Sequence, residues 1–279
     1  TQSVRLVCTQ VCVCVCVCVF VRLCQRKKIN KLIKLRTCAE KLLSVTRLLR
    51  KPDCLISLQS STAPQATMSS KGKYTYYYFN VRGRGEFIRW ILAASGLPWE
   101  DKRFEMQEWQ TLKPTIPGNA VPYLVTPEGY QLRQSEAIAR YVAKKGGLVP
   151  TDDLAAYKCD AIVDTVMIDM FDALVKFMPL KSPEERAKGF QNWNELAGPK
   201  FYGIIDQWVK ESRSGYLVGD RMTWADLTVA CIVNSLELID EIKASQDAYP
   251  DVKAFAEGIA QSGKVQDYLK TRPAGMFQF

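Results

Sequence analysis

Histidine is absent from the whole sequence of 279 residues. The chain therefore cannot use an imidazole as a general base or as a metal ligand, which are two frequent roles of this side chain. A catalyst built from this chain must rely on tyrosine, serine, arginine, lysine, carboxylates or the reactive group of a bound co-substrate.

Cysteine is scarce after Thr67. Eight of the ten cysteines lie between Cys8 and Cys54, and only Cys159 and Cys231 follow. No C-x-x-C motif follows the first expected strand, which argues against a mechanism in which the protein supplies the thiol. We expect Cys159 and Cys231 to be core residues on apolar helix faces, in a protein of the reducing cytoplasm.

The chain also lacks a long apolar run and, in its larger part, an excess of basic charge. The uncharged stretch from Val7 to Val21 has 15 residues, or 16 with Leu6, whereas a spanning helix needs about 20. Residues 1–67 hold 12 of the 38 basic residues and 2 of the 29 acidic ones, so the remainder holds 26 and 27. This balance predicts neither a nucleic-acid partner nor a membrane partner.

The first 67 residues contain the repeat VCVCVCVCV, from Val11 to Val19. As a strand it would carry thiols on one face, but the C-x-C spacing is not that of a zinc site. The basic stretch from Ile29 to Lys51 could instead belong to a targeting extension. Alternating GTG and TGT codons spell Val-Cys, and the first methionine is Met68. We therefore expect residues 1–67 to be a translated leader that is not part of the fold.

Residues 73–147 alternate short strands and helices. Apolar and aromatic patterns predict strands at 74–80, 99–105, 121–126 and 130–133, and helices at 85–96, 108–113 and 135–147. Gly96 is expected to end the first helix and Ser135 to cap the last. The order βαβαββα predicts a mixed sheet with helices on its faces, a thioredoxin-like domain.

Residues 152–279 read as helices throughout, which predicts an all-helical second domain. The stretch 156–178 carries two i+4 rows of apolar residues, typical of a long helix with one buried face. Ser182 is placed to cap the next helix. Thr223 and Asp226 form a capping-box pattern before an almost wholly apolar helix, which we expect at the centre of this domain.

The chain from residue 73 to 279 resembles the cytosolic glutathione S-transferases, and most of all the sigma class, which includes glutathione-dependent prostaglandin D synthase and the lens S-crystallins. The motifs that carry the resemblance are YYFNVRGRGEFIRW, EWQTLKPTIP, AVPYL, LRQSEAIARYVA and MTWADL, in this order. The resemblance implies conjugation of the glutathione thiolate to electrophilic, mostly apolar substrates, with glutathione as co-substrate, no required metal and a homodimeric assembly.

A free thiol has a pKa near ~8.5, so a donor that stabilises its anion makes it a nucleophile at neutral pH. The resemblance places the catalytic tyrosine at Tyr78 and its supporting arginine at Arg84. Strand alternation puts Tyr76 and Tyr78 on one face, so the pattern alone leaves either tyrosine as a packing residue. Arg84 could equally be an ion-pair partner at a helix start.

The resemblance also implies contacts to the rest of glutathione. Pro122 resembles the proline that follows a cis peptide bond in thioredoxin-like folds, with Val121 offering its backbone to the cysteinyl part. Gln134 and Ser135 precede a helix, whose N-terminus favours the γ-glutamyl carboxylate. The remaining implied contacts are Trp109 and Lys113 at the glycyl end, and Asp169 from the neighbouring subunit.

The sequence departs from the family pattern in three places. The loop Gly118 to Ala120 replaces a Phe-Gly followed by Gln or Lys, so one side-chain contact to glutathione is lost. Val175 stands where the prostaglandin enzyme has a tryptophan, and Met167 and Ile168 stand on two of its acidic positions. The last two departures argue against a prostaglandin-type isomerase, which remains an alternative, as does a structural lens S-crystallin.

The same resemblance implies an electrophile pocket beside Tyr78. Its wall is expected on the long helix, from Met167, Met170, Phe171 and Leu174, because flexible methionines suit varied apolar substrates.

Overall fold

The computed structural model describes residues 72–176 and 182–273. The expectations for residues 1–67, including the Val-Cys repeat, lie outside the described residues, as does Met178 at the end of the long apolar row.

The first half is built on one four-stranded sheet with the order β2-β1-β3-β4. Strand β1 is parallel to β2 and antiparallel to β3, which in turn is antiparallel to β4. The predicted mixed sheet of a thioredoxin-like domain is thus confirmed. The strands are β1 Tyr74–Phe79, β2 Trp99–Phe104, β3 Tyr123–Val125 and β4 Gln131–Arg133.

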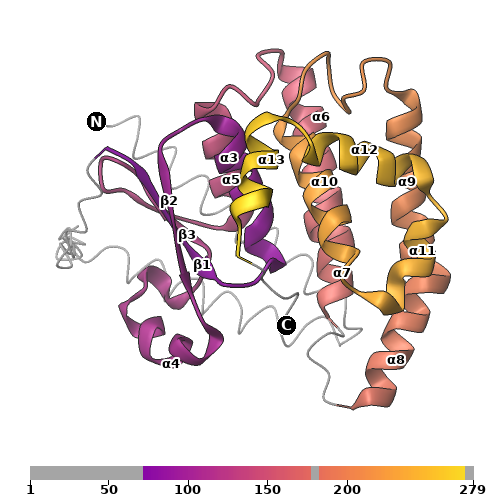
Figure 1. Ribbon diagram of the computed structural model, residues 1–279, viewed down its shortest axis with the longest axis horizontal. Helices are drawn as coiled ribbons and strands as arrows, with labels where there is room; N and C mark the ends of the chain where they lie inside the picture. Colours follow the sequence, from indigo (N-terminus) through magenta and orange to yellow (C-terminus); the bar gives the residue numbers. More distant parts are fainter. Residues whose placement is uncertain (1–71, 177–181, 274–279) are drawn as a thin grey trace, which may run out of the picture. The chain divides into compact units, whose positions relative to one another are not determined.

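Two helices cover one face of this sheet (Figure 1). They are α3, Glu86–Ser95, and α5, Ser135–Lys145. Gly96 ends α3 in the left-handed conformation, with φ of 69°, as expected. The short α4, Trp109–Leu112, belongs to the other face, where Trp109 packs on a cluster formed by Phe104, Ile116, Tyr123 and Val125.

The start of α5 differs from the prediction. Ser135 is the first residue of the helix rather than its cap, and the capping position is held by Gln134. Gln134 has φ of 74° and makes no side-chain capping bond. The Ser135 hydroxyl instead donates to the Glu136 carboxylate at 2.9 Å. Ser135 is thus a donor to the adjacent carboxylate, whereas a capping serine would accept from a backbone N–H of the helix.

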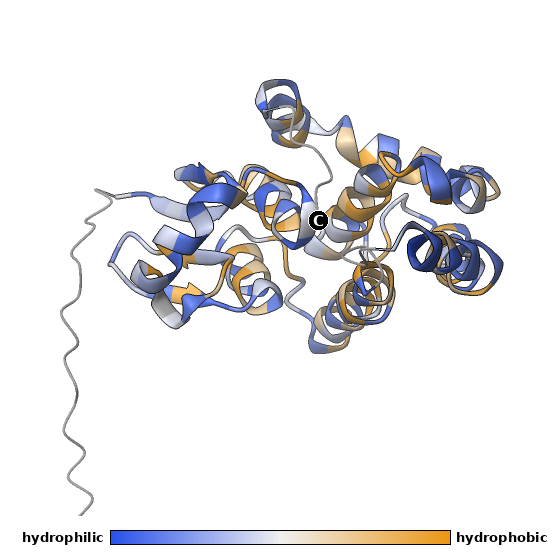
Figure 2. Ribbon diagram, turned by 90° about the horizontal axis from the view of Figure 1, so that it is seen from below, coloured by the Kyte–Doolittle hydropathy of each residue, from blue (hydrophilic) through white to orange (hydrophobic). Residues whose placement is uncertain are grey.

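The second half is all-helical, as predicted. One long helix runs through α6, Asp153–Asp164, a π-helical segment, Thr165–Phe171, and α7, Asp172–Val175. It is followed by α8 Pro183–Asn192, α9 Gly198–Glu211, α10 Trp224–Leu236, α11 Lys243–Asp247, α12 Pro250–Ala260 and α13 Gly263–Thr271. Figure 2 shows apolar residues where these helices face one another.

The long helix buries the wide apolar stripe read from its sequence. The buried members of the two rows are Ile162, Val163, Val166, Met167, Met170, Phe171 and Leu174. None of the last four is more than 2% exposed, so they are core residues rather than the expected open wall of an electrophile pocket. In the π-helical segment the backbone hydrogen bonds join residues five apart instead of four. The i+4 spacing of the apolar residues did not indicate this local feature.

Helix α10 joins the two halves, because it packs on α3 as well as on α6 and α12. Its capping box is confirmed. Asp226 accepts from the Thr223 backbone N–H at 2.7 Å and from the Thr223 hydroxyl at 2.8 Å, and it also binds the Leu217 N–H at 2.7 Å. Asp226 is fully buried, and this burial raises its pKa although the hydrogen bonds act in the opposite direction.

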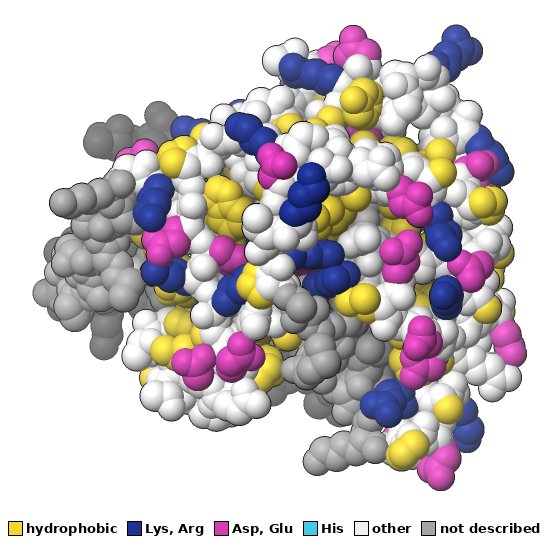
Figure 3. Space-filling model, viewed as in Figure 1, with side chains coloured by type: hydrophobic (Ala, Val, Ile, Leu, Met, Phe, Trp, Pro, Cys, Tyr) yellow, Lys and Arg dark blue, Asp and Glu magenta, His cyan; other side chains and the backbone are white. Residues whose placement is uncertain are grey.

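Two features are absent from residues 72–176 and 182–273, namely a membrane-spanning helix and a cluster of metal ligands. None of their helices is long and apolar enough to cross a bilayer. The same part of the chain brings no three cysteine or acidic side chains together as a candidate metal site. Basic and acidic side chains are interspersed on the face shown in Figure 3.

Candidate functional site

Tyr76 and Tyr78 both point from β1 toward the core under α3, as strand alternation requires. Their hydroxyls differ. The Tyr76 hydroxyl donates to the backbone oxygen of Gly85 at 2.9 Å, and its side chain is fully buried. The Tyr78 hydroxyl instead donates to no acceptor among the described residues, and the nearby backbone of Arg84 and Gly85 offsets part of the rise that burial causes in its pKa. Its own proton is therefore available to a further acceptor, whereas the proton of Tyr76 is used within the fold.

Two glycines let the turn before α3 close over the Tyr78 ring. A side chain at Gly85 would overlap this ring, with an ideal Cβ only 2.5 Å from the ring atoms Cε1 and Cγ. A Cβ at Gly83, which has φ of +34°, would lie 3.0 Å from the Tyr78 hydroxyl oxygen. The G-R-G sequence is thus required for the backbone amides to reach the phenol.

Burial raises the pKa of Tyr78, and the charges of Arg89 and then Arg84 offset part of this effect. The phenol stays protonated at neutral pH, which is the form that donates a hydrogen bond to an anion. A protonated donor beside a cation is what stabilisation of a thiolate requires.

Arg89 is a site residue that sequence reasoning missed. Its guanidinium is fully buried and lies 5.5 Å from the ring centroids of both Tyr76 and Tyr78. It donates to the backbone oxygens of Phe79 and Val81 at 3.0 Å. The sequence did contain a signal, because Arg89 lies inside the apolar stretch EFIRWIL. An arginine is rarely buried unless it is paired, so this position indicates a buried arginine with partners.

Arg84 joins three elements. It follows β1, its Nη1 lies 3.2 Å from the Glu136 Oε1 on α5, and its Nη2 forms an ion pair with Asp172 on α7. Its guanidinium also lies 5.5 Å from the centroid of the Phe171 ring. The predicted alternative, an ion-pair partner at a helix start, is therefore part of what the structure shows, and Glu136 and Asp172 are further residues that the sequence did not indicate.

A cavity of about 670 Å³ lies beside these residues. It brings together predicted site residues from three separate segments of the chain, namely Arg84, Val121, Pro122, Gln134 and Ser135. The Val121–Pro122 peptide is cis, as the resemblance implied. The helix start at Ser135 and the backbone of Val121 provide the polar groups that a peptide ligand needs.

Tyr78 is not among the residues that line this cavity. The other predicted residues that do not line it are Trp109, Lys113 and Asp169. Trp109 stacks on Phe104 with ring centroids 6.0 Å apart, and the Lys113 Nζ lies 5.9 Å from the Trp109 ring centroid. Both belong to the α4 side of the sheet. Asp169 is exposed on the π-helical segment of the long helix.

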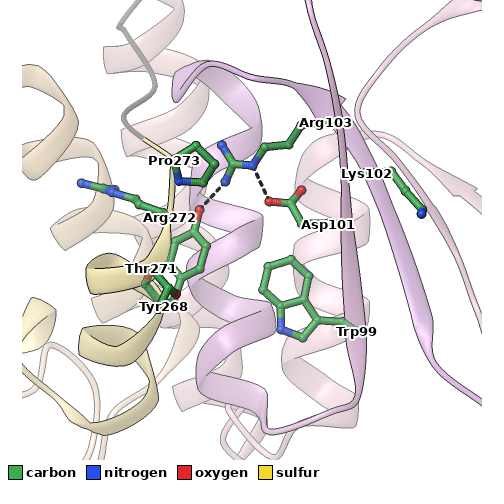
Figure 4. Close-up of a pocket in the computed structure, with 8 residues that line it drawn as sticks. All are labelled: Trp99, Asp101, Lys102, Arg103, Tyr268, Thr271, Arg272 and Pro273. Atoms are coloured by element: carbon green, nitrogen blue, oxygen red, sulfur yellow. Dashed lines mark hydrogen bonds and ion pairs between the residues drawn. The ribbon is translucent and has the colours of Figure 1, made fainter.

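A second cavity, of about 500 Å³, lies between β2 and α13 (Figure 4). Its charged groups bind one another. Arg103 pairs with Asp101 at 2.7 Å and donates to the Tyr268 hydroxyl at 2.9 Å, while Arg272 pairs with the buried Glu86 at 2.9 Å. This network continues to Arg89, which pairs with both Glu86 and Asp101. The second cavity thus borders a structural network behind Tyr78.

Both described cysteines are buried, as predicted, and neither forms a disulfide. Burial raises the pKa of the Cys159 thiol to about 11 and that of Cys231 well above its usual value. Neither lines the cavity beside Arg84. Neither of the two cysteines in the described part of the chain can therefore supply a thiol to this cavity.

Comparison with known proteins identifies two matching family models. The glutathione S-transferase N-terminal domain matches residues 74–144, and the glutathione S-transferase C-terminal domain matches residues 168–272.

Individual relatives agree with these models. The chain is 33% identical to glutathione S-transferase 3 of Caenorhabditis elegans, over 73% of this chain and 99% of the relative. It is 32% identical to the hematopoietic prostaglandin D synthase of Gallus gallus, over 72% and 96%. Among solved structures, the monomeric glutathione S-transferase Na-GST-3 of Necator americanus superposes with a TM-score of 0.63 at 33% identity, covering 72% of this chain and 98% of that one.

Proposed function

The chain belongs to the glutathione S-transferase family and is a glutathione transferase, and on this basis we propose that Tyr78 holds and activates the thiolate of glutathione. The observation that carries the proposal is the difference between the two tyrosine hydroxyls. The Tyr76 hydroxyl donates to the Gly85 backbone oxygen, whereas the Tyr78 hydroxyl lies against the turn of Gly83 to Gly85 and donates to no acceptor among the described residues.

The other ligand contacts are proposed from the cavity that Arg84 lines. Val121, beside the cis bond to Pro122, binds the cysteinyl backbone, and Gln134 and Ser135 bind the γ-glutamyl carboxylate at the start of α5. Their common position on one cavity wall supports this assignment. The Arg84 guanidinium stabilises the thiolate through its charge.

The glycyl end of glutathione is assigned to the α4 side of the sheet. Trp109 and Lys113 lie together there, and the position of Lys113 over the indole ring supports a joint role. Asp169 is assigned to the glutathione of the neighbouring subunit in a homodimer. Its exposure on the long helix is compatible with such a contact.

We further assign the chain to the sigma class, with residues 73–147 as the glutathione-binding domain and 152–279 as the helical domain that admits the electrophile. The enzyme acts in the cytoplasm, in detoxification. It works mainly by ionising the thiol and holding it in position for attack on the electrophile.

A second candidate is glutathione-dependent isomerisation of a prostanoid. It is favoured by the 32% identity to the Gallus gallus prostaglandin D synthase. It is disfavoured by Val175, Met167 and Ile168, which replace the tryptophan and two acidic residues of that enzyme's pattern. The two functions are distinguished by assays with a prostanoid endoperoxide and with a halogenated aromatic electrophile, each in the presence of glutathione. A transferase is expected to conjugate the aromatic electrophile faster than it isomerises the endoperoxide.

The test of the proposed catalytic role is a titration of bound glutathione followed by the ultraviolet absorbance of its thiolate. We expect the wild type to lower the thiol pKa by about two units from its free value near ~8.5, which corresponds to roughly 2.7 kcal/mol. Tyr78→Phe is expected to bind glutathione without this shift and to lose conjugation.

Tyr76→Phe is the matched control, because it removes a hydroxyl from the same face of the same strand. It is expected to keep the thiolate shift and to lose stability through its bond to Gly85. A thiolate shift that survives in Tyr78→Phe and disappears in Tyr76→Phe would contradict the assignment.

A further inference from the structure

Strand β4 ends at Arg133, and its register fixes which face of the sheet this side chain belongs to. Arg133 is the direct partner of Tyr123 on β3. Side chains of directly paired residues share a face, and Tyr123 packs in the cluster under Trp109. Arg133 therefore extends on the α4 side of the sheet.

The loop before β3 makes room for the Arg133 guanidinium. A side chain at Gly118 would overlap it, with an ideal Cβ 2.9 Å from the Arg133 Cζ. Gly118 also has φ of +69°, a conformation that other residues rarely adopt. The guanidinium thus lies against the backbone of the loop that carries Gly118 to Ala120, where the sequence departs from its relatives.

Arg133 also differs from the other arginine of the same cavity. Arg84 is paired with Glu136 and Asp172. No carboxylate of residues 72–176 or 182–273 forms an ion pair with Arg133, although both arginines line the cavity with Gln134 and Ser135. Arg133 therefore brings a positive charge to the cavity wall that the described part of the fold does not neutralise.

We propose that Arg133 binds the glycyl carboxylate of glutathione and replaces the side-chain contact missing from the loop at Gly118. The inference rests on the glutathione-binding role proposed above. A guanidinium is suited to a carboxylate because its planar fork donates two parallel hydrogen bonds. The glycyl end is the one that fits, since Arg133 shares the α4 side with Lys113, whereas the γ-glutamyl carboxylate is bound by the start of α5.

The test compares two ligands, glutathione and its glycyl monoethyl ester, which lacks only the charge of this carboxylate. Dissociation constants are measured by calorimetry on the full-length chain. We expect the wild type to bind glutathione more tightly than the ester. Arg133→Gln is expected to weaken glutathione binding about tenfold, as for loss of a charge-assisted hydrogen bond. Binding of the ester should change less than twofold, so the preference for glutathione falls.

Two further variants serve as a control and as an independent check of this test. Arg213→Gln removes an exposed arginine from the helical half and is expected to change neither constant. Gly118→Ala keeps Arg133 but fills the space beside its guanidinium, and should weaken glutathione more than the ester. The double variant Gly118→Ala with Arg133→Gln should bind glutathione only slightly more weakly than Gly118→Ala alone, because both changes remove the same interaction.

An unchanged affinity of Arg133→Gln for glutathione overturns the inference, and so does an equal loss for both ligands. These results are separable from a failure of the catalytic proposal. The thiolate shift at saturating glutathione depends on Tyr78 and is expected to survive in Arg133→Gln, whereas the preference for glutathione over the ester is read from binding alone.

Discussion

The ion pair between Arg84 and Asp172 connects the turn that holds Tyr78 to the long helix of the second half, across 88 positions of sequence. Arg84 lines the cavity, and Glu136 is its second ion-pair partner. The two carboxylates partly neutralise the guanidinium, so the cavity experiences less than the full charge of Arg84.

This pairing predicts opposite effects for the two partners. Arg84→Gln removes the cation and should raise the pKa of bound glutathione and lower kcat/KM by at least about tenfold, as for loss of one electrostatic stabiliser. Asp172→Asn should lower the thiolate pKa slightly, because Arg84 is then less neutralised. The measurement is the ultraviolet titration of the bound thiol.

The matched control for this pair is Arg140→Gln. Arg140 also joins α5 to the long helix, through an ion pair with Asp160 at 2.9 Å, and is similarly exposed. It should leave the thiolate pKa unchanged. The interpretation fails if Asp172→Asn and Arg84→Gln shift this pKa in the same direction.

Gly85→Ala should impair activity without unfolding the protein. Its methyl group would overlap the Tyr78 ring, so the phenol must move away from the backbone amides that anchor it. We expect kcat/KM to fall by about tenfold or more, since small displacements of a positioned group are costly. Gly258→Ala on α12, where a Cβ meets nothing within 4 Å, should keep full activity and slightly raise the melting temperature.

Tyr78 should ionise only at strongly alkaline pH in the absence of glutathione. Burial raises its pKa above the usual 10, so its folded form favours the proton. Any stability that this preference contributes is present below pH 10 and is lost as the pH rises through the folded-state pKa. The difference in absorbance near ~295 nm between wild type and Tyr78→Phe isolates this titration. A midpoint below 10 would contradict the burial argument.

Cys159 should be unreactive in the folded protein. With a pKa of about 11, only about 0.1% of this thiol is ionised at pH 8, and the thiolate is the reactive form. A disulfide reagent should therefore modify neither Cys159 nor Cys231 rapidly, and both should react in denaturant. Modified thiols are counted in the wild type and in the double variant Cys159→Ser/Cys231→Ser. The count in the double variant corrects for the cysteines before Thr67. Fast modification of Cys159 in the folded chain would disprove its core position.

Asp226→Asn should destabilise the fold by about 1–3 kcal/mol, because an amide nitrogen would face one of the donors that the carboxylate now accepts from. For a chain of this size, each 1 kcal/mol shifts the melting temperature by roughly 2–4 °C. Thr223→Ser keeps a hydroxyl at the cap and should cost far less. Equal losses in both variants would show that the carboxylate is not the important partner.

Local patterns were enough to predict the sheet, the helices and several of their ends. The capping box of Thr223 and Asp226 and the glycine end at Gly96 depend on neighbours within four residues, which the sequence displays directly. Ser135 shows the limit, since the helix begins at this residue rather than after it, and its hydroxyl donates to Glu136 instead of capping.

The site was predictable only as far as the family resemblance reached. Alternation could not separate Tyr76 from Tyr78, because both share a face and differ in which backbone group lies near each hydroxyl. Asp172 was missed, since its partner Arg84 comes from another element. Arg89 was missed, since it packs on tyrosines of β1, although its partner Glu86 lies on the same helix. The buried stripe that contains Met170 was predicted, but its assignment to a pocket wall was wrong, because the periodicity of an apolar stripe does not say whether it faces a core or a cavity.

Helix α3 is enclosed from both sides, by the sheet and α5 on one and by α10 and α13 on the other. The two family models divide the chain between 144 and 168, yet this helix needs elements from both parts to bury its side chains. Neither half is therefore an interchangeable module. A chimaera that joins one half to a distant relative must carry matched surfaces on α3 and α10, and denaturation of the intact protein should proceed in a single cooperative step.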